Sequence, residues 1–155
     1  MAYEWIAQRI NKKEFELSFI IINATDSYLH QWLIKQNFES YLIHHQGKKS
    51  YPTSFLKVLK LLLRIKPDAV HAHLFDANLI GLTAAKLLGI KKRIYTRHHS
   101  VSHHDDYPKA VKYDKLTNFL ATDIIAISKN VAQVLIEKEK VNPQKIQVIH
   151  HGFDL

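Results

Sequence analysis

Short apolar segments alternate with helical segments along the whole of this 155-residue chain. Strands that alternate with helices of 10–15 residues predict βαβ units and a parallel sheet. The strand segments are continuous apolar runs, which is typical of strands covered by helices on both faces. We therefore predict an α/β fold with a Rossmann-like, doubly wound parallel sheet in three layers, with about five or six strands. The predicted strands are residues 17–22, 41–43, 69–72, 94–96, 124–127 and 146–149. The predicted helices are residues 2–10, 27–36, 55–65, 78–88, 109–120 and 129–138.

The composition limits the class of protein and its compartment. The length fits one domain, and 46% apolar with 23% charged residues is ordinary for a soluble globular protein. The absence of cysteine excludes a disulfide framework and thiolate chemistry. The net charge of +8 would attract phosphates or anionic headgroups. No apolar run approaches the roughly 20 residues of a membrane span, so we expect a cytoplasmic protein whose membrane contact, if it has any, is peripheral at the inner face.

Polar side chains follow three of the predicted strands. His73 closes the third, Arg97, His98 and His99 follow the fourth, and Ser128 follows the fifth. In open α/β sheets, ligands bind outside the carboxyl ends of the strands. The pattern therefore predicts that these side chains border one cleft.

Each of these residues has a functional and a structural interpretation. Histidine can accept or donate a proton near neutral pH, so His98 could meet a sugar hydroxyl or lie exposed in a loop. His73 could touch a ligand or pair with His71 beneath a helix, and Arg97 could clamp a phosphate or lie at the surface. Ser128 could face the ligand, cap the following helix, or do both.

A dense polar segment follows these histidines. His103, His104, Asp105 and Asp106 include good zinc ligands, but adjacent residues seldom converge on one ion. We therefore predict a mobile loop over residues 97–108, with no metal and no cofactor. Near the end of the chain, Gly152 could permit a tight turn or a close backbone approach to a ligand.

Four segments, in this order and at this spacing, carry a family resemblance. They are PDAVHAH at 67–73, YTRH at 95–98, TDIIAIS at 122–128 and KIQVIHHGFD at 145–154. Together they resemble the N-terminal domain of family 4 glycosyltransferases with the GT-B fold. The likeness covers roughly residues 2–155.

The resemblance implies an acceptor-side domain of a retaining glycosyltransferase with no obligatory metal. A second domain would bind a nucleotide diphosphate-sugar, and the acceptor would be a glycan or a lipid-linked molecule. His98 would lie near the transferred sugar as the catalytic residue. His73, Arg97, His99, Ser128 and Gly152 would bind substrate, although Gly152 follows His151 where the family usually has asparagine.

The resemblance also implies that residues 1–155 form a single domain truncated at both ends. The family's first strand, which is central in the sheet, would precede Met1. We therefore expect a gap in the sheet, a non-standard strand order, or completion by a second copy in a homodimer. We also expect the isolated chain to be inactive.

Two other functions remain as alternatives. The eleven histidines could serve a metal-dependent hydrolase. The chain could also be a non-catalytic module that binds nucleotides or nucleic acid, although it lacks an interleaved aromatic and basic stripe. We therefore expect no nucleic-acid partner.

Overall fold

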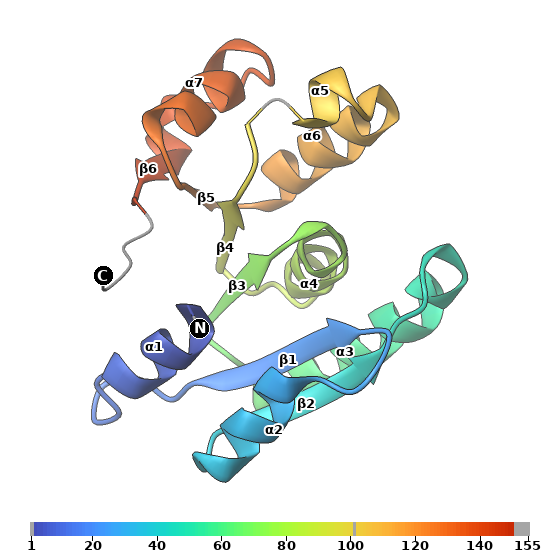
Figure 1. The fold of residues 1–155 in the computed structure, drawn as a ribbon, viewed down its shortest axis with the longest axis vertical. Coiled ribbons are helices and arrows are strands. Elements are labelled where there is room, and N and C mark those ends of the chain that lie inside the picture. Colours follow the sequence, from blue (N-terminus) through green and yellow to red (C-terminus); the bar gives the residue numbers. More distant parts are fainter. Residues whose placement is uncertain (1, 101, 151–155) are drawn as a thin grey trace. The chain divides into compact units, whose positions relative to one another are not determined.

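The computed structural model describes residues 2–100 and 102–150 (Figure 1). The chain divides into two compact units, Met1–Lys57 and Val58–Leu155. The α/β fold with parallel strands is confirmed, because all the strand pairs are parallel.

The first unit is built on a two-stranded parallel ladder. Its pairing runs from Ser18 opposite Glu39 to Asn23 opposite His44. The helix between the two strands begins where the Ser27 side chain accepts a hydrogen bond from the His30 amide. The elements are α1 (Ala2–Arg9), β1 (Ser18–Asn23), α2 (Tyr28–Lys35), β2 (Glu39–His44), the 3-10 turn η1 (Lys48–Ser50) and the first half of α3 (Tyr51–Ile65).

The second unit is built on a four-stranded parallel sheet in the order β3-β4-β5-β6. Its strands are β3 (Ala69–His73), β4 (Lys92–Arg97), β5 (Asp123–Ala126) and β6 (Ile146–Val148). Its helices are α4 (Phe75–Leu87), α5 (Ser102–Asp105), α6 (Val111–Leu120) and α7 (Lys129–Glu137), with 3-10 turns η2 (Pro108–Ala110) and η3 (Pro143–Lys145).

One face of this sheet carries the main core. Because the strands follow one another in one direction, right-handed crossovers place α4, α6 and α7 on the same face (Figure 1). Leu82 of α4, Leu120 of α6 and Leu135 of α7 meet there over Tyr95 and Ile124 of the sheet. All five side chains are buried. This packing fixes the strands whose ends carry the predicted site residues.

The six strands form two separate ladders, of two and four strands, and a gap in the sheet was one of the three outcomes expected. The prediction of a loop over residues 97–108 was wrong in part, because α5 forms inside it and η2 follows. The α5 turn brings His103 and His104 onto buried carboxylates, and these contacts are not visible in the local sequence.

The two ends of α4 have contrasting turns. At its C-terminus, Gly89 adopts a φ of 71°, and the Ile90 amide donates to the Ala85 carbonyl, which is how a glycine commonly caps a helix. At its N-terminus, Leu74 has φ 70° and ψ 163°, a region that is essentially restricted to glycine. This strained residue directly follows His73 at the end of β3.

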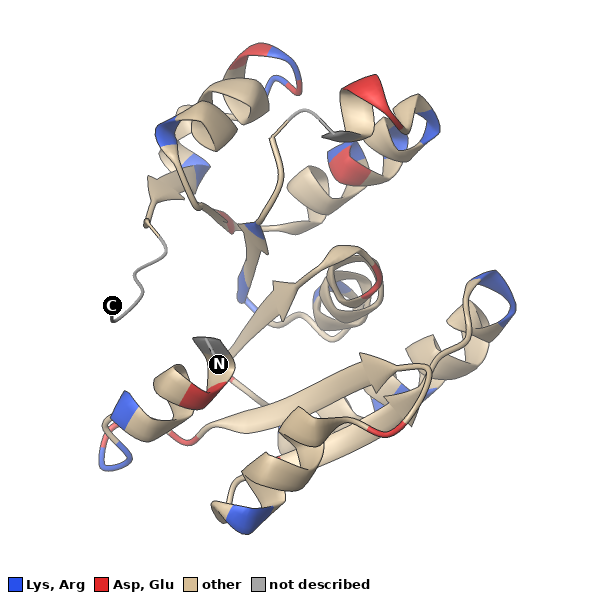
Figure 2. Cartoon of the chain, in the orientation of Figure 1, with Lys and Arg blue, Asp and Glu red and all other residues tan. Residues whose placement is uncertain are grey.

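Figure 2 shows Lys and Arg on many separate elements of both units. Among the helices that the structure describes, none has the length and apolar character needed to cross a membrane.

Candidate functional site

Three neighbouring strands end at one edge of the second unit's sheet. His73 of β3 lies opposite Thr96 of β4, and Arg97 of β4 lies opposite Ala126 of β5. The residues that follow these strands therefore emerge side by side. This register is the structural basis of the site.

A hollow of about 510 Å³ opens at this edge. His98 and His99, which follow β4, line it together with Ser128, which follows β5. Asp105, the last residue of α5, and the following Asp106 also line it. Imidazoles, a hydroxyl and carboxylates thus face one space, a set of groups suited to hydrogen-bonding a polyhydroxylated ligand.

His98 belongs to a row of three imidazoles. Its Nε2 lies 3.4 Å from Nδ1 of His73, and the rings of His73 and His71 lie 4.2 Å apart between centroids. His71 Nε2 in turn shares a 2.8 Å hydrogen bond with the Thr96 hydroxyl. A hydrogen bond between two imidazoles needs one N–H and one lone pair, so this contact couples the tautomers of His98 and His73 and helps to orient the His98 ring.

His71 is the end of this row that bonds to Thr96. Burial lowers the pKa of His71, and the nearby charge of His98 lowers it further. His71 is therefore mostly neutral at pH 7, and its hydrogen bond to Thr96 gives it a structural role.

Ser128 caps α7. Its Oγ accepts a hydrogen bond from the Val131 amide at 3.2 Å, and the same residue lines the hollow. The two interpretations of Ser128 from the sequence are therefore compatible in the structure.

Arg97 lies in the interior of the second unit, with its side chain only 3% exposed. Its Nη1 lies 3.0 Å from Asp114 Oδ1, its Nη2 lies 2.6 Å from Glu139 Oε1, and its Nε donates to the His99 carbonyl. The guanidinium is therefore engaged by two carboxylates of the protein. A substrate-binding role for Arg97 stays a prediction.

The network around Arg97 extends further into the core. Glu139 Oε2 accepts a 2.7 Å hydrogen bond from Asn118 Nδ2, and the Tyr95 hydroxyl donates to Asn118 Oδ1. Burial raises the pKa of Tyr95, so its hydroxyl stays protonated and can serve as a donor. Sequence reasoning missed Asp114, Asn118 and Glu139, because each reaches the group from a distant part of the chain.

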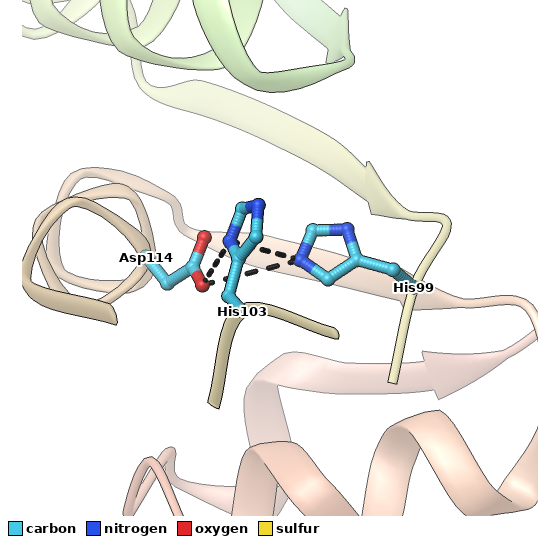
Figure 3. A group of neighbouring side chains, drawn as sticks. All are labelled: His99, His103 and Asp114. Carbon is cyan, nitrogen blue, oxygen red and sulfur yellow. Dashed lines mark hydrogen bonds and ion pairs between the residues drawn. The ribbon is translucent and has the colours of Figure 1, made fainter. Parts of the chain in front are cut away.

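Asp114 also faces two histidines (Figure 3). Its Oδ2 lies 2.7 Å from His103 Nδ1 and 3.9 Å from His99 Nε2, and these two nitrogens lie 3.1 Å apart. Burial acts to raise the pKa of Asp114, but hydrogen bonding to His99 and the charge of Arg97 outweigh it and keep this pKa below its ordinary value. The four-residue spacing of His99 and His103 was the available sequence signal for this group.

The structure thus brings His98, His99 and Ser128 to one hollow, with His73 in contact with His98. Arg97 lies in the buried ion-pair network. Gly152 lies outside the described residues.

Comparison with known proteins identifies the family. A model of Glycosyltransferase Family 4 matches residues 6–155. The UDP-Gal:alpha-D-GlcNAc-diphosphoundecaprenol alpha-1,3-galactosyltransferase of Escherichia coli is 33% identical over 107 residues, which cover 66% of this chain and 27% of that enzyme.

Solved structures show the same fold at low identity. Anabaena HepE in complex with UDP matches with a TM-score of 0.68 at 14% identity, over 89% of this chain and 45% of HepE. Acinetobacter baumannii MurG matches with a TM-score of 0.65 at 14% identity, over 99% of this chain and 40% of MurG. The chain therefore spans about a quarter of the curated relative and less than half of each of these structures, and its fold is the Rossmann-like half of a GT-B protein. Because the family model covers nearly its whole length, the chain belongs to glycosyltransferase family 4.

Proposed function

We propose that this chain is the acceptor-side domain of a retaining glycosyltransferase. The observation that carries the proposal is the shared hollow of His98 and Ser128 at adjacent strand ends, with His73 holding the His98 ring. Family membership favours this function over a metal-dependent hydrolase and over a module that binds nucleotides or nucleic acid.

His98 would contact the sugar that is transferred. Its contact with His73 orients the ring, and an imidazole nitrogen can donate to or accept from a hydroxyl group. Ser128, held by its cap of α7, and His99 would line the acceptor path. Rate enhancement would come from positioning of the two substrates and from electrostatic stabilisation of the departing diphosphate.

The donor would be a nucleotide diphosphate-sugar bound by a further domain, as the UDP complex of the HepE relative suggests. The acceptor would be a glycan or a lipid-linked glycan, since the E. coli relative is named for a diphosphoundecaprenol substrate. A lipid-linked acceptor would bring the domain to the membrane surface, where 22 basic against 14 acidic residues favour anionic headgroups.

The test is a titration of the purified chain with a water-soluble GlcNAc-diphosphate that carries a short alkyl chain. We expect NMR shift changes at His98, His99 and Ser128, and weaker binding for His98→Gln. The matched control is His44→Gln, because His44 is an exposed histidine in β2 of the other unit. Equal binding by wild type and His98→Gln would contradict the proposal.

A second variant separates the two roles of Ser128. Asparagine caps helices as well as serine does, so Ser128→Asn should keep α7 intact while filling part of the hollow. We expect this variant to have unchanged thermal stability and reduced acceptor binding. Unchanged acceptor binding would show that Ser128 serves only as a cap.

A further inference from the structure

We propose that His99, His103 and Asp114 form a binding site for a divalent transition-metal ion, with Zn²⁺ the ion that suits these ligands best. The residues come from three places, namely the segment after β4, the α5 turn and the first turns of α6 (Figure 3). The proposal is independent of the transferase function, because sugar transfer in this proposed mechanism needs no metal.

The distances fit a tetrahedral ion. His99 Nε2, His103 Nδ1 and Asp114 Oδ2 are separated by 3.1, 2.7 and 3.9 Å. Ligand atoms bound to zinc at about 2.0–2.1 Å in a tetrahedron lie about 3.3 Å from one another. The three observed separations lie on both sides of that value, so small side-chain adjustments would close the site.

Hydrogen bonding alone satisfies this group poorly. A neutral imidazole nitrogen carries either one hydrogen or one lone pair. His103 Nδ1 needs its hydrogen for the Asp114 carboxylate at 2.7 Å, so His99 Nε2 at 3.1 Å either shares that hydrogen or faces it with a hydrogen of its own. A metal ion in their midst would bond all three atoms, with the remaining hydrogen of His103 on Nε2.

The surroundings already hold the ligands in place. Arg97 Nη1 binds the other oxygen of Asp114 at 3.0 Å, which fixes the carboxylate with Oδ2 toward the two histidines. The ring of Phe75 packs edge-on against His103, with 5.6 Å between ring centroids. Such outer contacts orient ligands in natural metal sites.

The local charge also favours a cation. Arg97 contributes one positive charge and the carboxylates of Asp114 and Glu139 contribute two negative charges, so the group carries a net charge of −1 when its histidines are neutral. His99 is 32% exposed and lines the hollow, which gives an ion a route to the site and leaves room for a water molecule as fourth ligand. A bound metal ion would link His103 of α5 and His99 of the hollow's lining to Asp114 of α6.

The experiment uses the purified chain without a histidine tag and Co²⁺ as the probe, followed by displacement with Zn²⁺. We expect one equivalent of Co²⁺ with the strong visible absorption of a four-coordinate ion. His99→Gln and His103→Gln should each weaken binding by more than about 10-fold. Both histidines are partly exposed, so these changes disturb the core less than a change at Asp114 would.

Two controls address the other histidines of this histidine-rich chain. His44→Gln removes an exposed imidazole of the first unit, and His98→Gln removes one from the row with His73. Both variants should bind Co²⁺ as tightly as the wild type. X-ray absorption of the wild-type Zn²⁺ complex, which needs no variant, should show an N/O shell that includes imidazole.

Three results would overturn the proposal. The first is no stoichiometric Co²⁺ binding by the wild type. The second is binding that persists unchanged in His99→Gln and His103→Gln. The third is binding that is lost in His98→Gln alone, which would place the ion among the imidazoles of the other row.

Discussion

Replacement of Arg97 by methionine distinguishes a structural from a substrate-binding role for this residue. The change leaves two carboxylates without their cation, and the side chains of Asp114 and Glu139 are only 6% and 0% exposed. Breaking a buried pair by removing one partner costs about 3–5 kcal/mol. Since two carboxylates lose their partner here, we expect the upper part of that range.

The matched control is Lys92→Met at the other end of β4. Lys92 pairs with Asp123 at 3.0 Å, but the side chains are 58% and 31% exposed. Exposed ion pairs contribute less than about 1 kcal/mol, so this variant should differ little from the wild type. The two variants remove one positive charge each from the same strand and differ in the burial of the partner.

Amide hydrogen exchange of β4 and β5 is the suitable assay. Trp5 and Trp32 both lie in the first unit, so tryptophan fluorescence would not report on the second. Each 1.4 kcal/mol corresponds to a tenfold change, so the amides of β4 and β5 in Arg97→Met should exchange about a thousand- to several-thousandfold faster. Exchange at the rate of Lys92→Met, together with lost acceptor binding, would refute the structural role and restore the predicted contact with substrate.

Two further predictions concern β3 and its exit. Leu74→Gly should stabilise the second unit by about 1 kcal/mol. The change relieves about 1–3 kcal/mol of backbone strain, which exceeds the roughly 0.5–1 kcal/mol entropic cost of glycine. Little packing is lost, because the Leu74 side chain is 65% exposed. Leu74→Ala keeps the Cβ and should show no such gain in stability in thermal unfolding. Equal stability of the two variants would contradict the claim that the backbone at Leu74 is strained. Burial lowers the pKa of His71 from its ordinary value of 6.5. Below pH 6.5 the folded chain therefore binds fewer protons than the unfolded chain, and the stability should fall as the pH drops from 6.5 toward the folded pKa. Thermal unfolding across this window should show a shallower pH dependence for His71→Gln than for His44→Gln, and equal slopes would refute the assignment.

Much of the fold was predictable because its signals are local. Apolar runs located the strands, and Gly89 marked the end of α4 through a conformation that favours glycine. The start of α3 at Tyr51 was missed by four residues, although Pro52 in the first turn is a known sign of a helix start. The start of α4 was missed because Leu74 takes a conformation that its side chain gives no reason to expect.

The site divides in the same way. His98 and Ser128 were predictable from the ends of strands, because parallel strands bring their carboxyl ends to one edge. The burial of Arg97 was not predictable, because its partner Glu139 lies 42 positions further along the chain. Charged residues are rarely buried unless paired, and a pair of this kind exists only after the sheet has formed.

The strand order of the second unit has a consequence for how it folds. Each of the strands β4, β5 and β6 hydrogen-bonds to the strand that precedes it in the chain. The pairings are therefore as close in sequence as parallel strands allow, which keeps the contact order low for a parallel sheet. The sheet can grow one strand at a time in the direction of synthesis, with each connecting helix packing on the same face of the sheet.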